Sequence, residues 1–192
     1  MILPGSGKTE DSWVEDRADK QSRPVDPKDV SGFIVNSGYA GYCLYLHPRH
    51  QANENFRYLG RDKKSHAYVI AFAQKPEARD YLGKIYFSEP STTIRFLIQG
   101  FVWVDPATYQ ISRMYTGMLQ PEKANSIRGT TTDISYGRVR FGNSPQEFWL
   151  PQEVTVDWNF GITSYTSRHK YSDYHLFTVE TDYKLAPPKV EK

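Results

Sequence analysis

Short apolar segments separated by turn residues fill most of this chain, and they restrict its fold more than any other feature of the sequence. Their connections are too short for crossover helices, so each strand is expected to pair antiparallel with a neighbour in the chain. Tyr and Phe, which favour strands, number 14 and 10. The segments that we predict as strands lie at residues 56–60, 67–73, 84–88, 93–104, 109–118, 130–141, 147–158, 162–171 and 174–183. The best-defined turn is predicted at 105–108 (DPAT), because proline suits the second position of a type I turn and aspartate the first.

The segments at 93–104 and 147–158 are about twice as long as a usual strand, or roughly 40 Å at about 3.3 Å per residue. Gly100 interrupts the first of them, where a bend or bulge is expected. Sheets of such strands twist and coil, so that one face becomes concave. We therefore predict a mainly β (α+β) fold, with a long curved antiparallel sheet.

One hydrophobic core serves chains of up to roughly 250 residues, so residues 31–185 are expected to form a single domain. Residues 1–30 are predicted to be a disordered polar arm, because few apolar side chains offset the entropy of ordering it. Residues 186–192 are predicted to be a polar tail. Apolar spacing in 31–46 favours a helix, while its glycines leave a hairpin open as the alternative.

Composition excludes several kinds of partner and site. A net charge of +2 is too small to attract nucleic acid by itself. Cys43 is the only cysteine, so neither an internal disulfide nor a cysteine-based zinc site is expected. No segment approaches the roughly 20 apolar residues of a membrane-spanning helix, and the first residues lack the pattern of an export signal.

Residues 4–9 (PGSGKT) resemble the end of a phosphate-binding loop. That loop needs a glycine five residues before its second one, and Ile2 occupies the position. It also needs a preceding strand and a following helix, which the sequence does not indicate. We expect a flexible terminus without nucleotide binding, and no cofactor.

A metal site and hydrolytic chemistry are the remaining enzymatic alternatives. His169, Asp173 and His175 share a parity and could contribute metal ligands, but polar side chains on the solvent face of a sheet explain them more simply. No G-x-S-x-G motif is present, and Cys43 lies among apolar neighbours. We expect no metal and no enzymatic activity.

Several motifs carry a family resemblance. Residues 101–106 (FVWVDP) and 109–114 (YQISRM) are similar to a hairpin found in outer-membrane lipoprotein-sorting proteins and their uncharacterised bacterial relatives. Residues 132–137 (TDISYG), 148–151 (FWLP) and 168–174 (RHKYSDY) extend the similarity. Together they resemble the LolA/LolB-like superfamily over residues 32–185. The resemblance implies a half-barrel whose concave side is covered by one or a few helices, an acyl-binding hollow, a periplasmic location and a role without catalysis.

These observations predict a non-catalytic binding or carrier domain for an apolar ligand, such as a lipid, an acyl chain or a lipoprotein. The alternatives are a hydrolase or metal-dependent enzyme, and a scaffold that pairs through an exposed sheet edge. The resemblance allows peripheral association with a membrane. A cytoplasmic location stays open as well, because a polar arm stands where such proteins usually carry an export signal. The oligomeric state is left open.

One face of the long strands is the candidate ligand site. A single short helix would cover about 10 Å of that face, so part of it is expected to remain a pocket. A fully packed core is the alternative. The predicted ligand-binding residues are Ile94, Phe96, Ile98, Val102, Val154, Val156 and Trp158.

Overall fold

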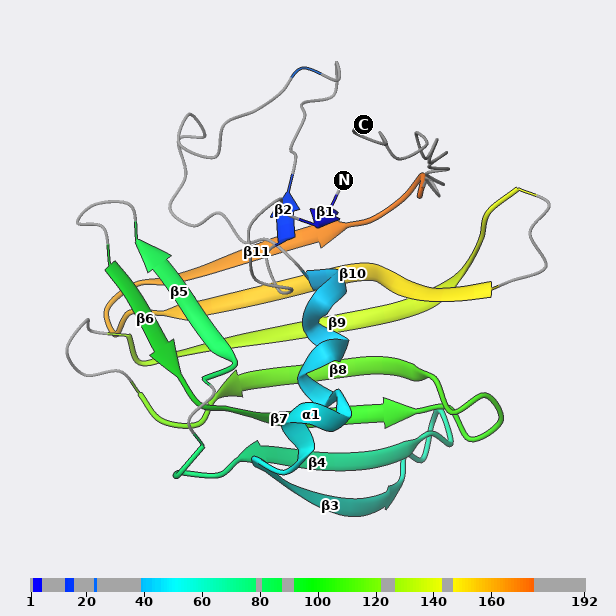
Figure 1. Ribbon diagram of the computed structural model, residues 1–192, viewed down its shortest axis with the longest axis horizontal. Coiled ribbons are helices and arrows are strands. Elements are labelled where there is room, and N and C mark those ends of the chain that lie inside the picture. Colours follow the sequence, from blue (N-terminus) through cyan, green and yellow to red (C-terminus); the bar gives the residue numbers. More distant parts are fainter. Residues whose placement is uncertain are drawn as a thin grey trace, which may run out of the picture.

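The computed structural model describes residues 2–4, 13–15, 23, 39–78, 81–87, 92–121, 127–142 and 147–174. It confirms the predicted fold class. The described residues are mainly β, and a seven-stranded antiparallel sheet dominates them without closing into a barrel (Figure 1). Helical structure is confined there to two short elements, which lie across one face of that sheet.

The large sheet is a meander with a detour. Its order is β11-β10-β9-β8-β7-β4-β3, and all of its neighbours are antiparallel. Its strands are β3 (Glu54–Arg61), β4 (Tyr68–Gln74), β7 (Ile98–Val104), β8 (Ile111–Met118), β9 (Gly129–Arg140), β10 (Glu147–Asn159) and β11 (Ser164–Lys170). The detour between β4 and β7 is a separate hairpin of β5 (Gly83–Phe87) and β6 (Thr92–Phe96).

The prediction of one long strand at 93–104 is wrong, because two separate strands, β6 and β7, occupy this segment. The chain joins the large sheet only after Leu97, so that β6 pairs with β5 and only β7 pairs with β4 and β8. The buried Gln74 side chain fixes this break, because its Oε1 accepts a hydrogen bond of 3.0 Å from the Ile98 amide. Gly100 lies inside β7, and the pairing of β7 with β4 and β8 has no register shift at this residue.

Two predicted segments at the ends of the domain are only partly described. The helix favoured at 31–46 is confirmed over its second half, where η2 (Tyr39–Leu46) is a 3₁₀ helix followed by α1 (Pro48–Gln51). In the strand predicted at 174–183, Tyr174 follows β11 outside any strand, and the remaining residues lie outside the described part. The short strands β1 (Ile2–Pro4) and β2 (Trp13–Glu15) pair with each other within the predicted arm. The rest of that arm, apart from residue 23, and the tail lie outside the described residues.

The two faces of the large sheet differ in what covers them. We call the face under η2 the helix side and the opposite one the outer face. Strand registers place one row on the helix side, and its members are Ile70, Val102, Met114, Ile134, Val154 and His169. The four central members are buried, and Ile70 and His169 at its ends are half-buried. Most of the hydrophobic core lies on this side, where the centre of the sheet is covered by η2 and one end by the β5–β6 hairpin (Figure 1).

Two hairpins at the same end of the sheet turn in the same way. In the predicted turn after β7, Asp105 Oδ1 accepts hydrogen bonds from the Ala107 and Thr108 amides at 3.0 and 2.8 Å. The loop after β3 repeats this arrangement, since Asp62 Oδ1 accepts from the Lys64 and Ser65 amides at 3.0 and 2.7 Å. The sequence analysis identified only the first, because proline marks it.

Candidate functional site

The predicted ligand-binding residues lie within the packed core on the helix side. Ile94, Ile98, Val102, Val154, Val156 and Trp158 are at most 5% exposed and belong to one cluster. Phe96 is half-buried and packs against that cluster. The β5–β6 hairpin supplies the cover that the sequence analysis did not count, because it treated 93–104 as one strand of the sheet. The ligand-binding role of these seven residues stays a prediction.

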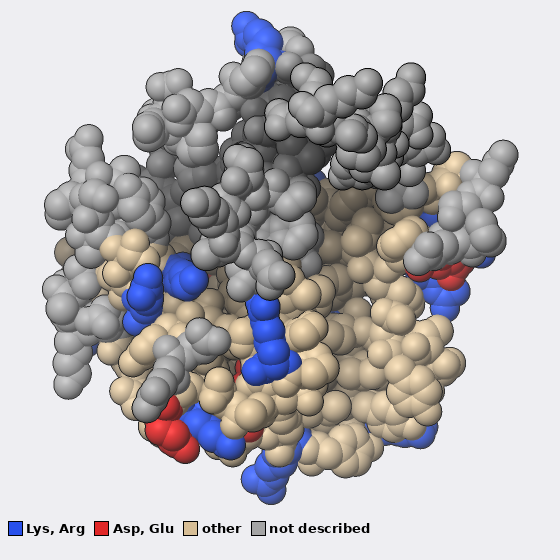
Figure 2. Space-filling view, in the orientation of Figure 1, with Lys and Arg blue, Asp and Glu red and all other residues tan. Residues whose placement is uncertain are grey.

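Uncharged surface also remains on the helix side, away from the hairpin. Figure 2 looks onto this side, and its lower right part carries few charged residues. Half-buried Ile70, Val104 and Ile111 lie toward this end of the sheet. These three residues do not line the groove on the outer face, which is the candidate site.

A groove of about 490 Å³ lies on the outer face. It crosses β3, β4, β7, β8 and the start of β9. Two cross-strand rows give most of its lining, and the registers define them as Asn55-Ala73-Gln99-Gly117-Thr131 and Arg57-Ala71-Phe101-Tyr115. A twisted sheet is saddle-shaped, so each face is hollow along one diagonal. The hollow stays open here because small residues occupy its middle.

The chemistry of the groove is mainly apolar. Ala71, Ala73 and Gly117 leave room above the sheet, and the rings of Phe101 and Tyr115, whose centroids are 6.5 Å apart, form one wall. Phe101 is 39% exposed, which is unusual for a large apolar side chain on a strand unless something covers it. Amide and hydroxyl groups of the other row give the groove a polar margin.

Among the described residues that line the groove, Arg57 is the one that carries a charge. Within the described part of the chain, no ion pair or hydrogen bond engages its guanidinium. The nearest acid in its row is Asp133 on β9, which is bound by Arg113 through contacts of 2.8 and 2.5 Å. This pair raises the pKa of Arg113, mainly through the hydrogen bond, and Arg113 also stacks over Trp103 at 4.7 Å. The groove therefore carries a positive charge at its β3 end.

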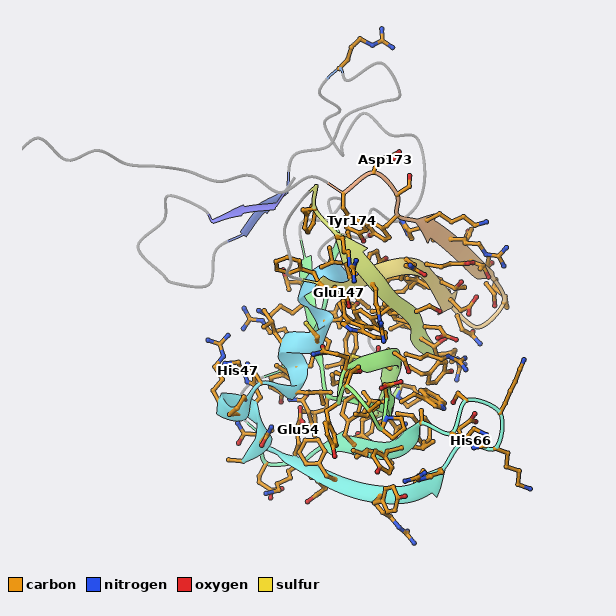
Figure 3. All side chains as sticks on the ribbon, turned by 90° about the vertical axis from the view of Figure 1, so that its right-hand side faces the viewer. His47, Glu54, His66, Glu147, Asp173 and Tyr174 are labelled. Carbon is orange, nitrogen blue, oxygen red and sulfur yellow. The ribbon has the colours of Figure 1, made fainter. Side chains whose placement is uncertain are left out.

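Glu54 is a second unusual group, on the opposite side of β3. Its side chain is 4% exposed, and neither carboxyl oxygen has a hydrogen-bond partner among the described residues. Burial raises its pKa to about 7. Figure 3 places it near the helices, at the end of β3 away from the His66 loop. Within the described residues it belongs to no group of His, Cys, Asp or Glu side chains that could hold a metal ion.

The candidate metal ligands are not assembled into a site. His169 lies on the helix side of β11, where its ring is 5.0 Å from that of Tyr39. Asp173 lies in the exposed segment after β11, near Tyr174 (Figure 3), and His175 is outside the described residues. In the part of the chain that the structure describes, no three His, Cys, Asp or Glu side chains form a group that could hold a metal ion.

The sequence analysis missed the groove, although one signal for it was present. Beyond Gly100 the residues Phe101, Val102, Trp103 and Val104 are all apolar, which places large apolar side chains on both faces of the strand. In residues 71–73 (AFA), the two alanines share one face of the strand, and their small side chains indicate a shallow depression on that face. The sequence does not reveal the strand registers, which decide that these alanines lie beside Phe101 in the folded sheet.

Comparison with known proteins finds no match to this chain among family models, curated proteins or solved structures. The resemblance to the LolA/LolB-like superfamily accordingly stays a prediction. Neither of the two described helices has the length and apolar character needed to cross a membrane.

Proposed function

We propose that this protein is a non-catalytic binding or carrier domain that takes one apolar chain, such as an acyl chain, in the outer-face groove. The observation that carries the proposal is the groove itself, which combines a low floor, a wall of two aromatic rings and an exposed Phe101. Its volume of about 490 Å³ lies within the range of roughly 300 to 1,000 Å³ that is usual for small-molecule sites.

The expected affinity follows from burial of the chain. Each methylene removed from water contributes about 0.8 kcal/mol, so about ten methylenes would supply roughly 8 kcal/mol. The free-energy cost of association reduces this sum. The groove is also open to solvent on one side, so a bound chain would be only partly buried. Dissociation constants in the micromolar range or weaker are therefore expected.

The LolA/LolB-like resemblance agrees with the proposed kind of ligand and with the open sheet, but not with the face on which the groove lies. A long antiparallel sheet that stays open, with helices on one face, is the architecture that the resemblance implies. We accordingly propose an acyl chain of a lipid or lipoprotein as the ligand and the periplasm as the location. The proposed groove lies on the outer face, whereas the resemblance implies a hollow on the helix side.

Pairing through the edge of the sheet has less support. β3 is an edge strand, and Phe56, Tyr58 and Leu59 on it are exposed. However, the register shifts between Tyr58 and Gly60, which marks a β-bulge or irregularity. Bulges interrupt the regular row of backbone groups that a partner strand needs, and natural edge strands use them to prevent such pairing.

Filling the groove is the test of the proposed function. In Ala71→Trp, an indole replaces a methyl group on the groove floor, opposite Phe101. Titration with a fatty acid that carries an environment-sensitive fluorophore is expected to show saturable binding by the wild type. The Trp variant should bind at least tenfold more weakly, because the chain loses roughly two methylenes of buried contact or more.

Two further variants make the result specific to the outer face. Thr155→Trp adds the same ring on the outer face of β10, outside the groove lining, and should bind as the wild type does. Phe96→Ala removes a ring on the helix side and should also retain binding. The proposal fails if the wild type takes up no probe, or if Phe96→Ala loses binding while Ala71→Trp keeps it.

A further inference from the structure

We infer that the groove selects a single-chain ligand with a carboxylate headgroup, and that Arg57 binds this headgroup. The inference rests on the proposed function and adds the chemical class of the ligand. It assigns a direction to the bound molecule, with the charged end at β3 and the apolar end toward Phe101 and Tyr115.

The order of side chains along one row supports this direction. Arg57 lies opposite Ala71, which lies opposite Phe101. Neighbouring strands are about 4.8 Å apart, so the guanidinium and the Tyr115 ring originate about 14 Å apart on strands β3 and β8. An elongated molecule that lies across the strands would therefore meet a cation at one end and aromatic rings at the other.

The charges around the groove support an anionic end. The described residues that line the groove include no Asp or Glu. Asp133, the next residue of the row, is held by both nitrogens of an Arg113 fork. Glu54 lies on the same strand as Arg57, but it is buried on the helix side, opposite Gln74. Arg57 is thus the cation with which a bound anion would pair.

The guanidinium of Arg57 favours an oxyanion, either a carboxylate or a phosphate. Its N–H groups form a fork that matches the two oxygens of a carboxylate, and such charge-assisted pairs are stronger than neutral hydrogen bonds. The volume of the groove suits one chain rather than the two chains of a bilayer lipid. A fatty acid combines both features.

The experiment compares dodecanoate with dodecanol, which has the same chain and a neutral headgroup, by displacement of the fluorescent probe. The wild type is expected to prefer dodecanoate by about tenfold at low salt, as one charge-assisted hydrogen-bonded pair would give. Arg57→Gln should lose about tenfold in affinity for dodecanoate and keep its affinity for dodecanol. Added salt should weaken dodecanoate binding to the wild type.

Arg61→Gln is the matched control. It removes the same charge from the same strand, but Arg61 lies opposite Tyr68 on the helix side and donates to the hydroxyl of that residue at 3.2 Å. It should leave both affinities unchanged. If Arg57→Gln leaves dodecanoate binding unchanged while dodecanol still binds, the headgroup inference is wrong and the groove remains. If neither compound binds to the wild type, the proposed function fails together with the inference.

Discussion

Gly100→Ala is expected to lower the free energy of unfolding by about 3 kcal/mol, because an added Cβ at this position has no free space. It would lie 2.0 Å from the backbone oxygen of Tyr115 and 3.0 Å from the ring of Phe72. The nearer atom belongs to the backbone of β8, so relief requires β7 and β8 to move apart. Urea denaturation followed by tryptophan fluorescence measures the change.

Gly117→Ala is the control from the facing strand. Its Cβ would meet the Thr130 oxygen at 3.4 Å and the Thr131 methyl group at 3.5 Å, which are ordinary contacts. This substitution should be neutral or should stabilise the protein by about 0.4 to 1 kcal/mol, since it reduces the entropy of the unfolded chain. Equal unfolding midpoints for the two variants would contradict this prediction, because they would show that the space between β7 and β8 at Gly100 admits a methyl group.

The structural role of Gly100 could not be predicted from the sequence alone. A bend or bulge was predicted at this glycine, within one continuous strand at 93–104. The structure places the break at Leu97 and uses Gly100 for close approach to Phe72 and Tyr115. Both roles need a residue without a side chain, so composition cannot separate them. The deciding contact is the Gln74 side chain on the Ile98 amide, which joins residues 24 positions apart.

The fold class was predictable because it depends on local signals. Alternation of apolar residues and short turns is enough to predict antiparallel strands, and the Asp105-Pro106 turn was identified from its own residues. The candidate site was not predictable in the same way. Parity correctly placed Val102 and Val154 on one face, but it could not show that β5 and β6 cover that face.

Glu54→Gln is expected to stabilise the protein by about 3 kcal/mol at pH 8 and to have little effect at pH 4. Burial raises the pKa of the Glu54 carboxyl from 4.5 to about 7, and no neighbouring charge contributes to the shift. The charged form is therefore disfavoured in the folded protein. A neutral amide of nearly the same shape removes this cost, which is about 1.36 kcal/mol for each pKa unit.

The direction of the pH dependence follows from proton binding. Between pH 4.5 and about 7 the folded protein retains the Glu54 proton while the unfolded chain has lost it. The stability contributed by this proton is fully present below pH 4.5, and it is lost as the pH rises through about 7. Above that value the contribution is constant.

The difference between wild type and Glu54→Gln isolates this single group, because all other titrating residues contribute equally to both proteins. Glu153→Gln serves as the control, since the Glu153 side chain is 45% exposed and its ion pair with Arg168, at 3.4 Å, lies at the surface. Its substitution should change stability by less than about 1 kcal/mol at any pH. Arg49 on α1 and Lys75 after β4 are the cationic side chains on the elements next to Glu54. Arg49 Nε donates to His50 Nε2 at 2.9 Å, and Lys75 is bound to the Ala52 carbonyl at 2.8 Å. If either cation paired with Glu54 in solution, the carboxylate would be favoured and Glu54→Gln would destabilise the protein at pH 8. Stabilisation at pH 8 that disappears at pH 4 therefore distinguishes a buried neutral acid from an ion pair.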